Sequence, residues 1–135
     1  MVKAVARTAR QRPTDAELEI LAALWAKGPS TVRQLYRFLL QTRPIHYNSV
    51  LKTLQIMLEK KLVVRDDTER PQVYRAAAPR GDTERHFIKD LTARLFGGSA
   101  AALVLRALST HRPSREELAA LRKRLDQLDE RANDD

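Results

Sequence analysis

Hydrophobic residues recur at helical spacing in three successive segments of the first half of the chain, over residues 14–27, 31–41 and 47–61. The first segment opens with Thr14–Glu17, which has the S/T-x-x-E form of a capping box, and it ends at a Gly-Pro pair. The second segment begins at a Ser-Thr pair, either residue of which can cap a helix, and closes ahead of Pro44. The pattern predicts three consecutive helices.

The third of these segments separates apolar from polar positions on opposite faces of a helix. The apolar face is expected to carry Val50, Leu54, Met57, Leu58 and Lys61. The opposite face holds Asn48, Lys52, Gln55 and Glu59, and its first half is rich in groups that donate to or accept from a base edge or a phosphate. A solvated helix surface is the alternative interpretation of this face.

Two short β-rich runs follow, residues 62–65 and 72–76, with the polar stretch 66–70 between them. This arrangement predicts a β-hairpin, in which Pro71 suits the first residue of a strand or a sheet edge because it has no N–H to donate. Three helices and a hairpin are the element order of a winged helix-turn-helix, whose third helix enters the major groove of DNA.

The rest of the chain predicts three more helices and no strand. Asp82 can cap a helix that ends at Gly97, Ser99 can cap a second, and Ser114–Glu117 repeats the capping-box form after Pro113. The predicted fold is mainly α with a small β-hairpin wing: a basic flexible arm (1–13), a winged-helix DNA-binding domain (14–79) and a helical dimerisation domain (80–135).

The charge is divided unequally between these parts. The chain carries a net charge of +8, and residues 1–79 hold 14 basic and 7 acidic side chains, against 11 and 10 in residues 80–135. A local excess of this kind favours binding of a polyanion such as nucleic acid, although a solvated basic surface is the alternative.

Several classes of function are excluded or disfavoured by what the sequence lacks. The absence of cysteine excludes disulfides, thiolate metal sites and thiol catalysis. His46, His86 and His111 lie on separate segments without metal-ligand spacing, and no glycine-rich nucleotide-binding motif occurs. We therefore predict no enzymatic activity, no cofactor and no metal. No apolar run reaches the length of a membrane span or of a secretory leader, so we expect a cytoplasmic protein without membrane partners.

The C-terminal helices carry narrow apolar faces, most clearly a leucine seam spaced 3, 4, 3 in the last helix. Packing on the preceding helices is one way to bury this seam, and packing on a second copy of the chain is another. We favour a homodimer, because so small a segment gains from burying its apolar faces on a partner. The candidate dimerisation residues are Phe87, Leu91, Leu103, Leu118, Leu121, Leu125 and Leu128.

Several fragments in order and at consistent spacing resemble the penicillinase/methicillin-resistance repressor family (BlaI/MecI type). They are Thr14–Leu21 with Leu24–Trp25, Thr31–Leu35, Tyr47–Leu54 with Leu58–Val63, and Val73–Tyr74. The resemblance spans about Thr14 to Leu128. It implies a homodimeric winged-helix transcriptional repressor that binds a palindromic operator in double-stranded DNA and dimerises through its C-terminal helices.

The resemblance also assigns candidate residues. The family's recognition helix corresponds to residues 47–60, with Tyr47, Asn48, Ser49, Lys52 and Thr53 as candidates for DNA contact. Arginines on the second helix, before the third helix and around the wing are candidate phosphate ligands, or else merely solvated: Arg33, Arg37, Arg43, Arg65, Arg70 and Arg75.

The chain departs from the family pattern at several points. Lys61 stands where members commonly have Gly, which costs about 1 kcal/mol if the backbone there is left-handed. Ile56 replaces a residue that is often charged, and it suits either a neighbouring subunit or a thymine methyl group. The C-terminal cysteine cluster of the copper-responsive members is absent, which excludes a copper thiolate sensor.

The signal that releases the repressor is also open. Members that respond to β-lactams are cut at an Asn-Phe bond, whereas this chain has Leu105–Leu108 in the corresponding stretch and no Asn-Phe anywhere. The signal is then a different cut by an inducing protease, a ligand or a sensor protein, and dimer disruption is a suitable release mechanism. The alternative function is a winged-helix interaction module that docks an acidic protein without reading DNA.

Overall fold

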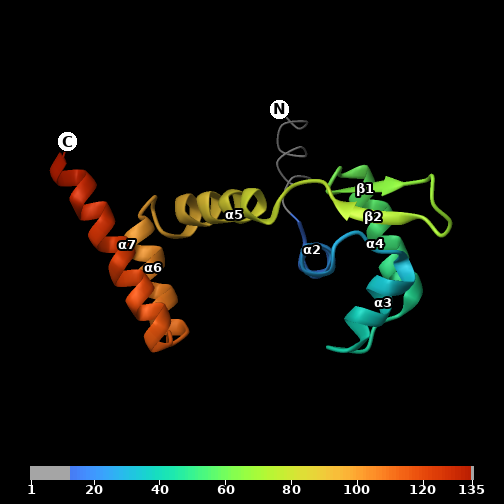
Figure 1. Ribbon diagram of the computed structural model, residues 1–135, viewed down its shortest axis with the longest axis horizontal. Helices are drawn as coiled ribbons and strands as arrows, with labels where there is room; N and C mark the ends of the chain where they lie inside the picture. The colour runs from blue at the N-terminus through green and yellow to red at the C-terminus, as the bar shows by residue number, and fades with distance from the viewer. Residues whose placement is uncertain (1–12, 135) are drawn as a thin grey trace. The chain divides into compact units, whose positions relative to one another are not determined.

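The computed structural model describes residues 13–134, and its helices and strands are labelled in Figure 1. In chain order they are α2 (Asp15–Lys27), α3 (Val32–Leu40), α4 (Tyr47–Glu59), β1 (Val63–Asp66), β2 (Val73–Ala76), α5 (Arg80–Leu95), α6 (Ala100–Thr110) and α7 (Arg115–Asp134). The predicted fold class, mainly helical with a small hairpin after three helices, is confirmed. The chain divides into two compact units between Ile88 and Lys89. Apart from Pro13, the expected basic arm lies outside the described residues.

The first two helices begin with complete capping boxes. At α2, the Thr14 N–H donates to Glu17 Oε1 at 2.8 Å and the Glu17 N–H donates to Thr14 Oγ1 at 3.3 Å. Thr31 and Gln34 exchange the equivalent bonds at α3, at 2.9 and 3.2 Å. Each box satisfies two backbone donors that the first turn of a helix otherwise leaves unpaired, so local sequence defines where both helices start.

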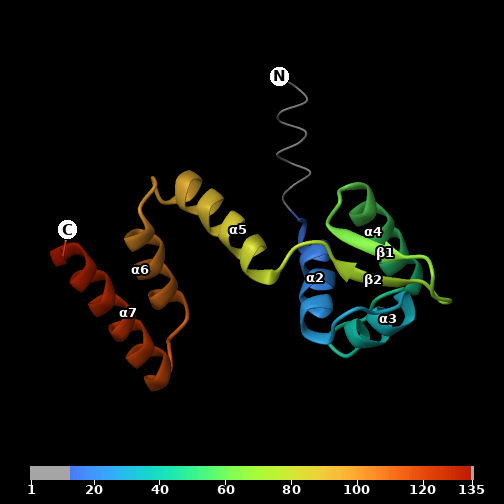
Figure 2. The same cartoon turned by 45° about the horizontal axis from the view of Figure 1, so that its top comes forward.

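The three helices and the hairpin enclose one hydrophobic core (Figure 2). Its buried side chains are Ile20, Leu21, Ala23 and Leu24 of α2, Leu35 and Leu39 of α3, Val50, Leu54 and Met57 of α4, and Val63 and Tyr74 of the hairpin. Burial of the 50, 54, 57 face of α4 turns its opposite face to solvent, as the helical spacing predicts.

The hairpin is antiparallel, with Val63 opposite Ala76 and Asp66 opposite Val73. It is extended on one side by Ser30, whose N–H donates to the Tyr74 carbonyl at 2.9 Å and whose carbonyl accepts from the Tyr74 N–H at 2.8 Å. The second strand begins at Val73, so Pro71 lies in the connection and not at the first position of a strand.

The predicted third helix extended two residues too far. The helix α4 ends at Glu59, Lys60 is its C-cap, and Lys61 has a left-handed backbone with φ of 65°. The reversal at Lys61 lets the Leu62 N–H donate to the Met57 carbonyl at 2.9 Å and turns the chain into β1. Lys61 is therefore exposed and lies off the apolar face to which the spacing assigned it.

Two of the three predicted C-terminal caps are confirmed. The Ala102 N–H donates to Ser99 Oγ at 3.0 Å, and Ser114 and Glu117 form a capping box at 2.8 and 3.1 Å. The prediction for Asp82 was wrong, because α5 begins at Arg80 and Asp82 lies within its first turn. Its N–H donates to the carbonyl of Pro79, 3.1 Å away, so the chain enters the helix two residues earlier.

The C-terminal helices bury no side chain fully. Within residues 75–133 every side chain keeps intermediate or high exposure. Among the candidate dimerisation residues, four are half-buried (Phe87, Leu103, Leu118, Leu121) and three are exposed (Leu91, Leu125, Leu128). In the part of the chain that the structure describes, no single helix is long and apolar enough to cross a membrane. Only α5 and α6 taken together, as a bent pair, have the required length and apolar composition.

Candidate nucleic-acid interface

The exposed face of α4 is a polar surface with one apolar residue at its centre. Asn48, Ser49, Lys52, Gln55 and Glu59 are exposed along it. Ile56, which is 39% exposed, lies among them. The buried Val50, Leu54 and Met57 hold the other side of the same helix in the core. The helix therefore offers donors, acceptors and one aliphatic group on a rigidly held surface, which is the chemistry that base edges in a major groove can meet.

Tyr47, the first residue of α4, belongs to an aromatic cluster with α3. Its ring meets the Tyr36 ring edge-on at 5.6 Å between centroids, and the Arg33 guanidinium lies 5.5 Å above it. These contacts leave Tyr47 half-buried. They fix the start of α4 against α3 and hold the Arg33 cation beside it.

Ser49 and Thr53 are linked within α4. The Thr53 hydroxyl donates to the Ser49 carbonyl at 2.8 Å, one turn earlier. Its hydrogen is thereby committed to the backbone, and the Thr53 oxygen keeps only its capacity to accept. Ser49 is more exposed than Thr53 and forms no side-chain hydrogen bond among the described residues.

The N-terminus of α4 differs from those of α2 and α3 in having no side-chain cap. His46 is the N-cap residue, and its side chain accepts no bond from the first turn. The Ser49 N–H stands at the position whose donor the cap side chain accepts in α2 and α3, and here it donates to the His46 carbonyl at 3.0 Å. The positive end of the helix dipole still favours a phosphate oxygen at this helix start.

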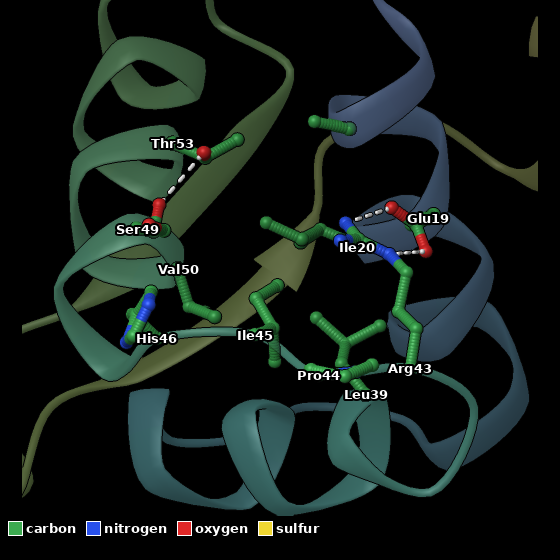
Figure 3. A pocket seen from close by; sticks show the side chains of 11 residues that line it. Glu19, Ile20, Leu39, Arg43, Pro44, Ile45, His46, Ser49, Val50 and Thr53 are labelled. Carbon is green, nitrogen blue, oxygen red and sulfur yellow. Dashed lines mark hydrogen bonds and ion pairs between the residues drawn. The ribbon is translucent and has the colours of Figure 1, made fainter.

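Arg43, just before α4, is held by a carboxylate of α2. Its Nε donates to Glu19 Oε2 at 3.0 Å and its Nη2 donates to Oε1 at 2.6 Å (Figure 3). The hydrogen bond from Arg43, and then its charge, lower the pKa of Glu19, while the same bond raises the pKa of Arg43. The pair borders a pocket of about 190 Å³ between α2 and the first half of α4, lined also by Ile45, His46 and Thr53.

The wing carries a second pair of this kind. Arg65 Nε donates to Asp67 Oδ1 at 2.6 Å, and Asp67 with Tyr74 raises the pKa of Arg65. The Asp66 carboxylate accepts from the Thr68 hydroxyl and N–H at 2.6 and 2.9 Å, which lowers its pKa and shapes the turn. Arg70 and Arg75 are exposed on the same hairpin.

The chain is similar to one known protein family over most of its length. A model of the penicillinase repressor family matches residues 13–127, which include every helix and strand from α2 to α6 and the first part of α7. The chain belongs to the penicillinase repressor family. No curated protein matches the chain. The family consists of DNA-binding transcriptional repressors, which are regulators and not enzymes.

In this chain, the residues that the sequence singled out for DNA contact come together only in part. Asn48, Ser49 and Lys52 share the exposed face of α4, whereas Tyr47 packs on α3 and Thr53 borders the pocket. The role of each in DNA contact stays a prediction. Across residues 13–134, no group of three or more His, Asp or Glu side chains is arranged to hold a metal ion.

The sequence did not predict the carboxylate partners of Arg43 and Arg65. Glu19 lies 24 residues before Arg43, and no local spacing rule connects them. The Asp67 contact was within reach of sequence reasoning, because Arg65 and Asp67 are two residues apart in a strand that runs into a turn. The contact of the Tyr36 ring with the Tyr47 ring joins two helices and was not predicted either.

Proposed function

We propose that this member of the penicillinase repressor family acts in the cytoplasm as a homodimeric transcriptional repressor that binds a palindromic operator, with α4 in the major groove of each half-site. The observation that carries the proposal is the division of α4 into a buried apolar face and an exposed face bearing Asn48, Ser49 and Lys52. A helix fixed by its own core in this way presents side chains to base edges without a cost of ordering its backbone.

Under this proposal the arginines contact DNA phosphates, and the side chains of α4 contact the bases. Phosphate contacts fix the position of a protein on DNA, and base contacts select the sequence. Arg33 beside Tyr47, Arg37 on α3 and Arg43 before α4 suit phosphates flanking the groove. Arg65, Arg70 and Arg75 lie in the hairpin and suit the DNA phosphates next to the major groove, which the wing of a winged helix contacts. We assign sequence selection to Asn48, Ser49, Lys52 and Ile56.

A second copy of the chain is the proposed occupant of the exposed apolar surface on the C-terminal helices. Leu95, Leu105 and Leu125 are 69%, 68% and 61% exposed. Apolar side chains at this exposure on three successive helices favour burial against a partner. A twofold partner would also present two copies of α4 to two half-sites, as a palindrome requires.

Release from DNA follows from the same arrangement. Two half-sites bound together hold the dimer far more tightly than either alone, so a signal that separates the subunits weakens operator binding. We propose that an inducing protease or sensor protein acts on the C-terminal helices. The Leu105–Leu108 stretch that replaces the family's Asn-Phe site lies in α6, and Leu105 is exposed there.

Selection of bound fragments from genomic DNA by the purified protein tests this function, since it returns both the sequence and the spacing of the half-sites. Lys52→Ala should then weaken binding to the selected duplex by roughly 10- to 100-fold and binding to a mixed-sequence duplex much less. Lys123→Ala removes the same charge from exposed α7 and should leave both affinities nearly unchanged.

Equal losses on both duplexes would remove Lys52 from base reading. Failure to enrich any fragment at low salt would favour the interaction-module alternative.

A further inference from the structure

Two of the six arginines proposed as phosphate ligands already hold a carboxylate through a fork of two nitrogens. Arg43 uses Nε and Nη2 on Glu19, at 3.0 and 2.6 Å, and Arg65 uses Nε and Nη2 on Asp67, at 2.6 and 3.5 Å. A guanidinium binds a phosphate with the same two-pronged geometry. One edge of an arginine therefore cannot serve its carboxylate and a DNA phosphate at the same time.

We propose that Glu19 and Asp67 compete with DNA phosphates for Arg43 and Arg65, and so lower the affinity of this repressor for DNA. This inference rests on the proposed function. Glu19 and Asp67 are thus assigned to the interface although neither needs to touch DNA.

The exposure of both pairs makes the exchange possible. The side chains are 46% and 35% exposed in the Arg43–Glu19 pair and 36% and 57% exposed in the Arg65–Asp67 pair. Ion pairs so open to solvent are screened and contribute little to folding, so an incoming phosphate can replace the carboxylate without opening the core. The Lys60–Glu17 pair shows the contrast, because its side chains are only 19% and 3% exposed.

The two pairs also lie in separate parts of the fold. Arg43 and Glu19 join the turn before α4 to α2, and Arg65 and Asp67 lie in the wing. Within residues 13–134, Arg33, Arg37, Arg70 and Arg75 form no salt bridge, so the competition is confined to two of the six candidate ligands.

The test measures binding of the full chain to a mixed-sequence duplex of about 30 base pairs, because phosphate contacts do not depend on sequence. Glu19→Gln should tighten binding roughly 3- to 10-fold at about 50 mM salt, and the salt slope should steepen by about 0.9 for each bound subunit. The gain should therefore shrink about threefold for each bound subunit when the salt is raised to 200 mM. Asp67→Asn should act in the same direction.

Two controls separate this competition from a general effect of charge. Asp15→Asn removes a carboxylate from the same helix α2, at an exposed position that has no ion pair among the described residues, and should change binding far less. In an Arg43→Ala background, Glu19→Gln should lose most of its effect. Thermal unfolding should move by less than about 5 °C in each variant, because the pairs are exposed.

Weaker binding by Glu19→Gln would overturn the inference and would assign Glu19 to orienting Arg43 for its phosphate, and unchanged binding would overturn it by showing no competition. An equal gain from Asp15→Asn would overturn it in favour of net charge. If the unmodified protein binds no duplex at low salt, the proposed function fails first. If it binds and the variants do not respond, only the inference fails.

Discussion

The winged-helix unit and the C-terminal helices are built from similar local elements but bury their apolar residues to very different extents. Both contain capped amphipathic helices, with capping boxes at Thr14 and Thr31 in one and at Ser114 in the other. The first unit buries eleven hydrophobic side chains in one core. Within residues 89–133 no side chain is buried. Good helix caps therefore do not by themselves make a core.

The difference shows what each unit needs to be stable. Most of the stability of a protein helix comes from the packing of its apolar face and not from its intrinsic helix propensity. In the first unit, α2, α3 and α4 pack on one another and on the hairpin within one chain. The apolar faces of α5, α6 and α7 would find their packing on a second copy. Folding of the second unit is then coupled to protein concentration, and folding of the first is not.

The largest effect is expected from removing a core side chain of the first unit. Leu54 is fully buried in α4, so Leu54→Ala should lower the free energy of unfolding by about 3 kcal/mol. Trp25 is the only tryptophan of the chain and packs against this core, so its fluorescence in a urea titration reports the unfolding of the first unit.

Leu40→Ala is the matched control, because Leu40 is a leucine of the same unit that is 42% exposed. It should cost less than about 1 kcal/mol. Similar losses for the two variants would mean that the core does not dominate the stability of this unit.

The second prediction concerns the proposed partner surface. Leu125→Asp places a charge in the leucine seam of α7, where a dimer would bury it without a counterion, and should weaken dimerisation roughly 100-fold. Sedimentation equilibrium measures the change, and the Trp25 unfolding transition should stay in place. The same variant should also weaken operator binding, because avidity is lost.

Gln127→Asp adds the same charge to α7 away from the leucine seam and should leave the dimer nearly intact. If the wild-type chain stays monomeric at high concentration with its C-terminal helices folded, the second unit does not need a partner. The contrast between the two units would then be wrong.

How far the sequence predicts this protein depends on the range of the interaction. The capping box of α2 and the apolar spacing of α2, α3 and α4 lie within a few residues, and they were predicted correctly except at Lys61, whereas the choice between Ser30 and Thr31 as the cap of α3 was left open. The start of α5 was predicted wrongly because Asp82 is a residue type that often caps helices. In the structure the Pro79 carbonyl accepts the first hydrogen bond of the helix, and the residue type at 79 does not reveal this.

The parts of the candidate site that depend on helical geometry could be predicted from the sequence. The parts that depend on contacts between distant residues could not. The exposed face of α4 follows from the spacing of its buried residues. The partners of Arg43 and Lys60 lie 24 and 43 residues away in sequence, on α2. They come close to Arg43 and Lys60 only because the helices pack around one core. Local patterns carry no information about such pairs.

A smaller effect is expected from the buried ion pair of the first unit. Glu17 accepts from the Thr14 N–H at 2.8 Å and also binds Lys60 Nζ at 2.9 Å, while its side chain is 3% exposed. Glu17→Gln keeps the cap, as Gln34 does in α3, but leaves Lys60 without a counterion. We expect a loss of about 1–2 kcal/mol in urea unfolding, since Lys60 stays partly solvated.

The double variant Glu17→Gln/Lys60→Met identifies the source of that loss. Removing the stranded cation should restore much of the stability. No recovery would mean that the cap, and not the ion pair, was damaged by the first substitution.

The smallest effect is expected at Lys61, where the first unit tolerates a strained backbone that a weakly packed segment would not. Its φ of 65° is a conformation that glycine adopts without steric cost and that lysine adopts with it. Lys61→Gly should raise the free energy of unfolding by about 0.5–1 kcal/mol, because relief of the strain exceeds the added entropy of the unfolded chain. Lys61→Ala removes the same charge but keeps the Cβ atom, so it should give no such gain. A gain of equal size from alanine would trace the effect to the lysine charge, whereas a gain from glycine alone would show that the core of the first unit holds Lys61 left-handed against its own preference.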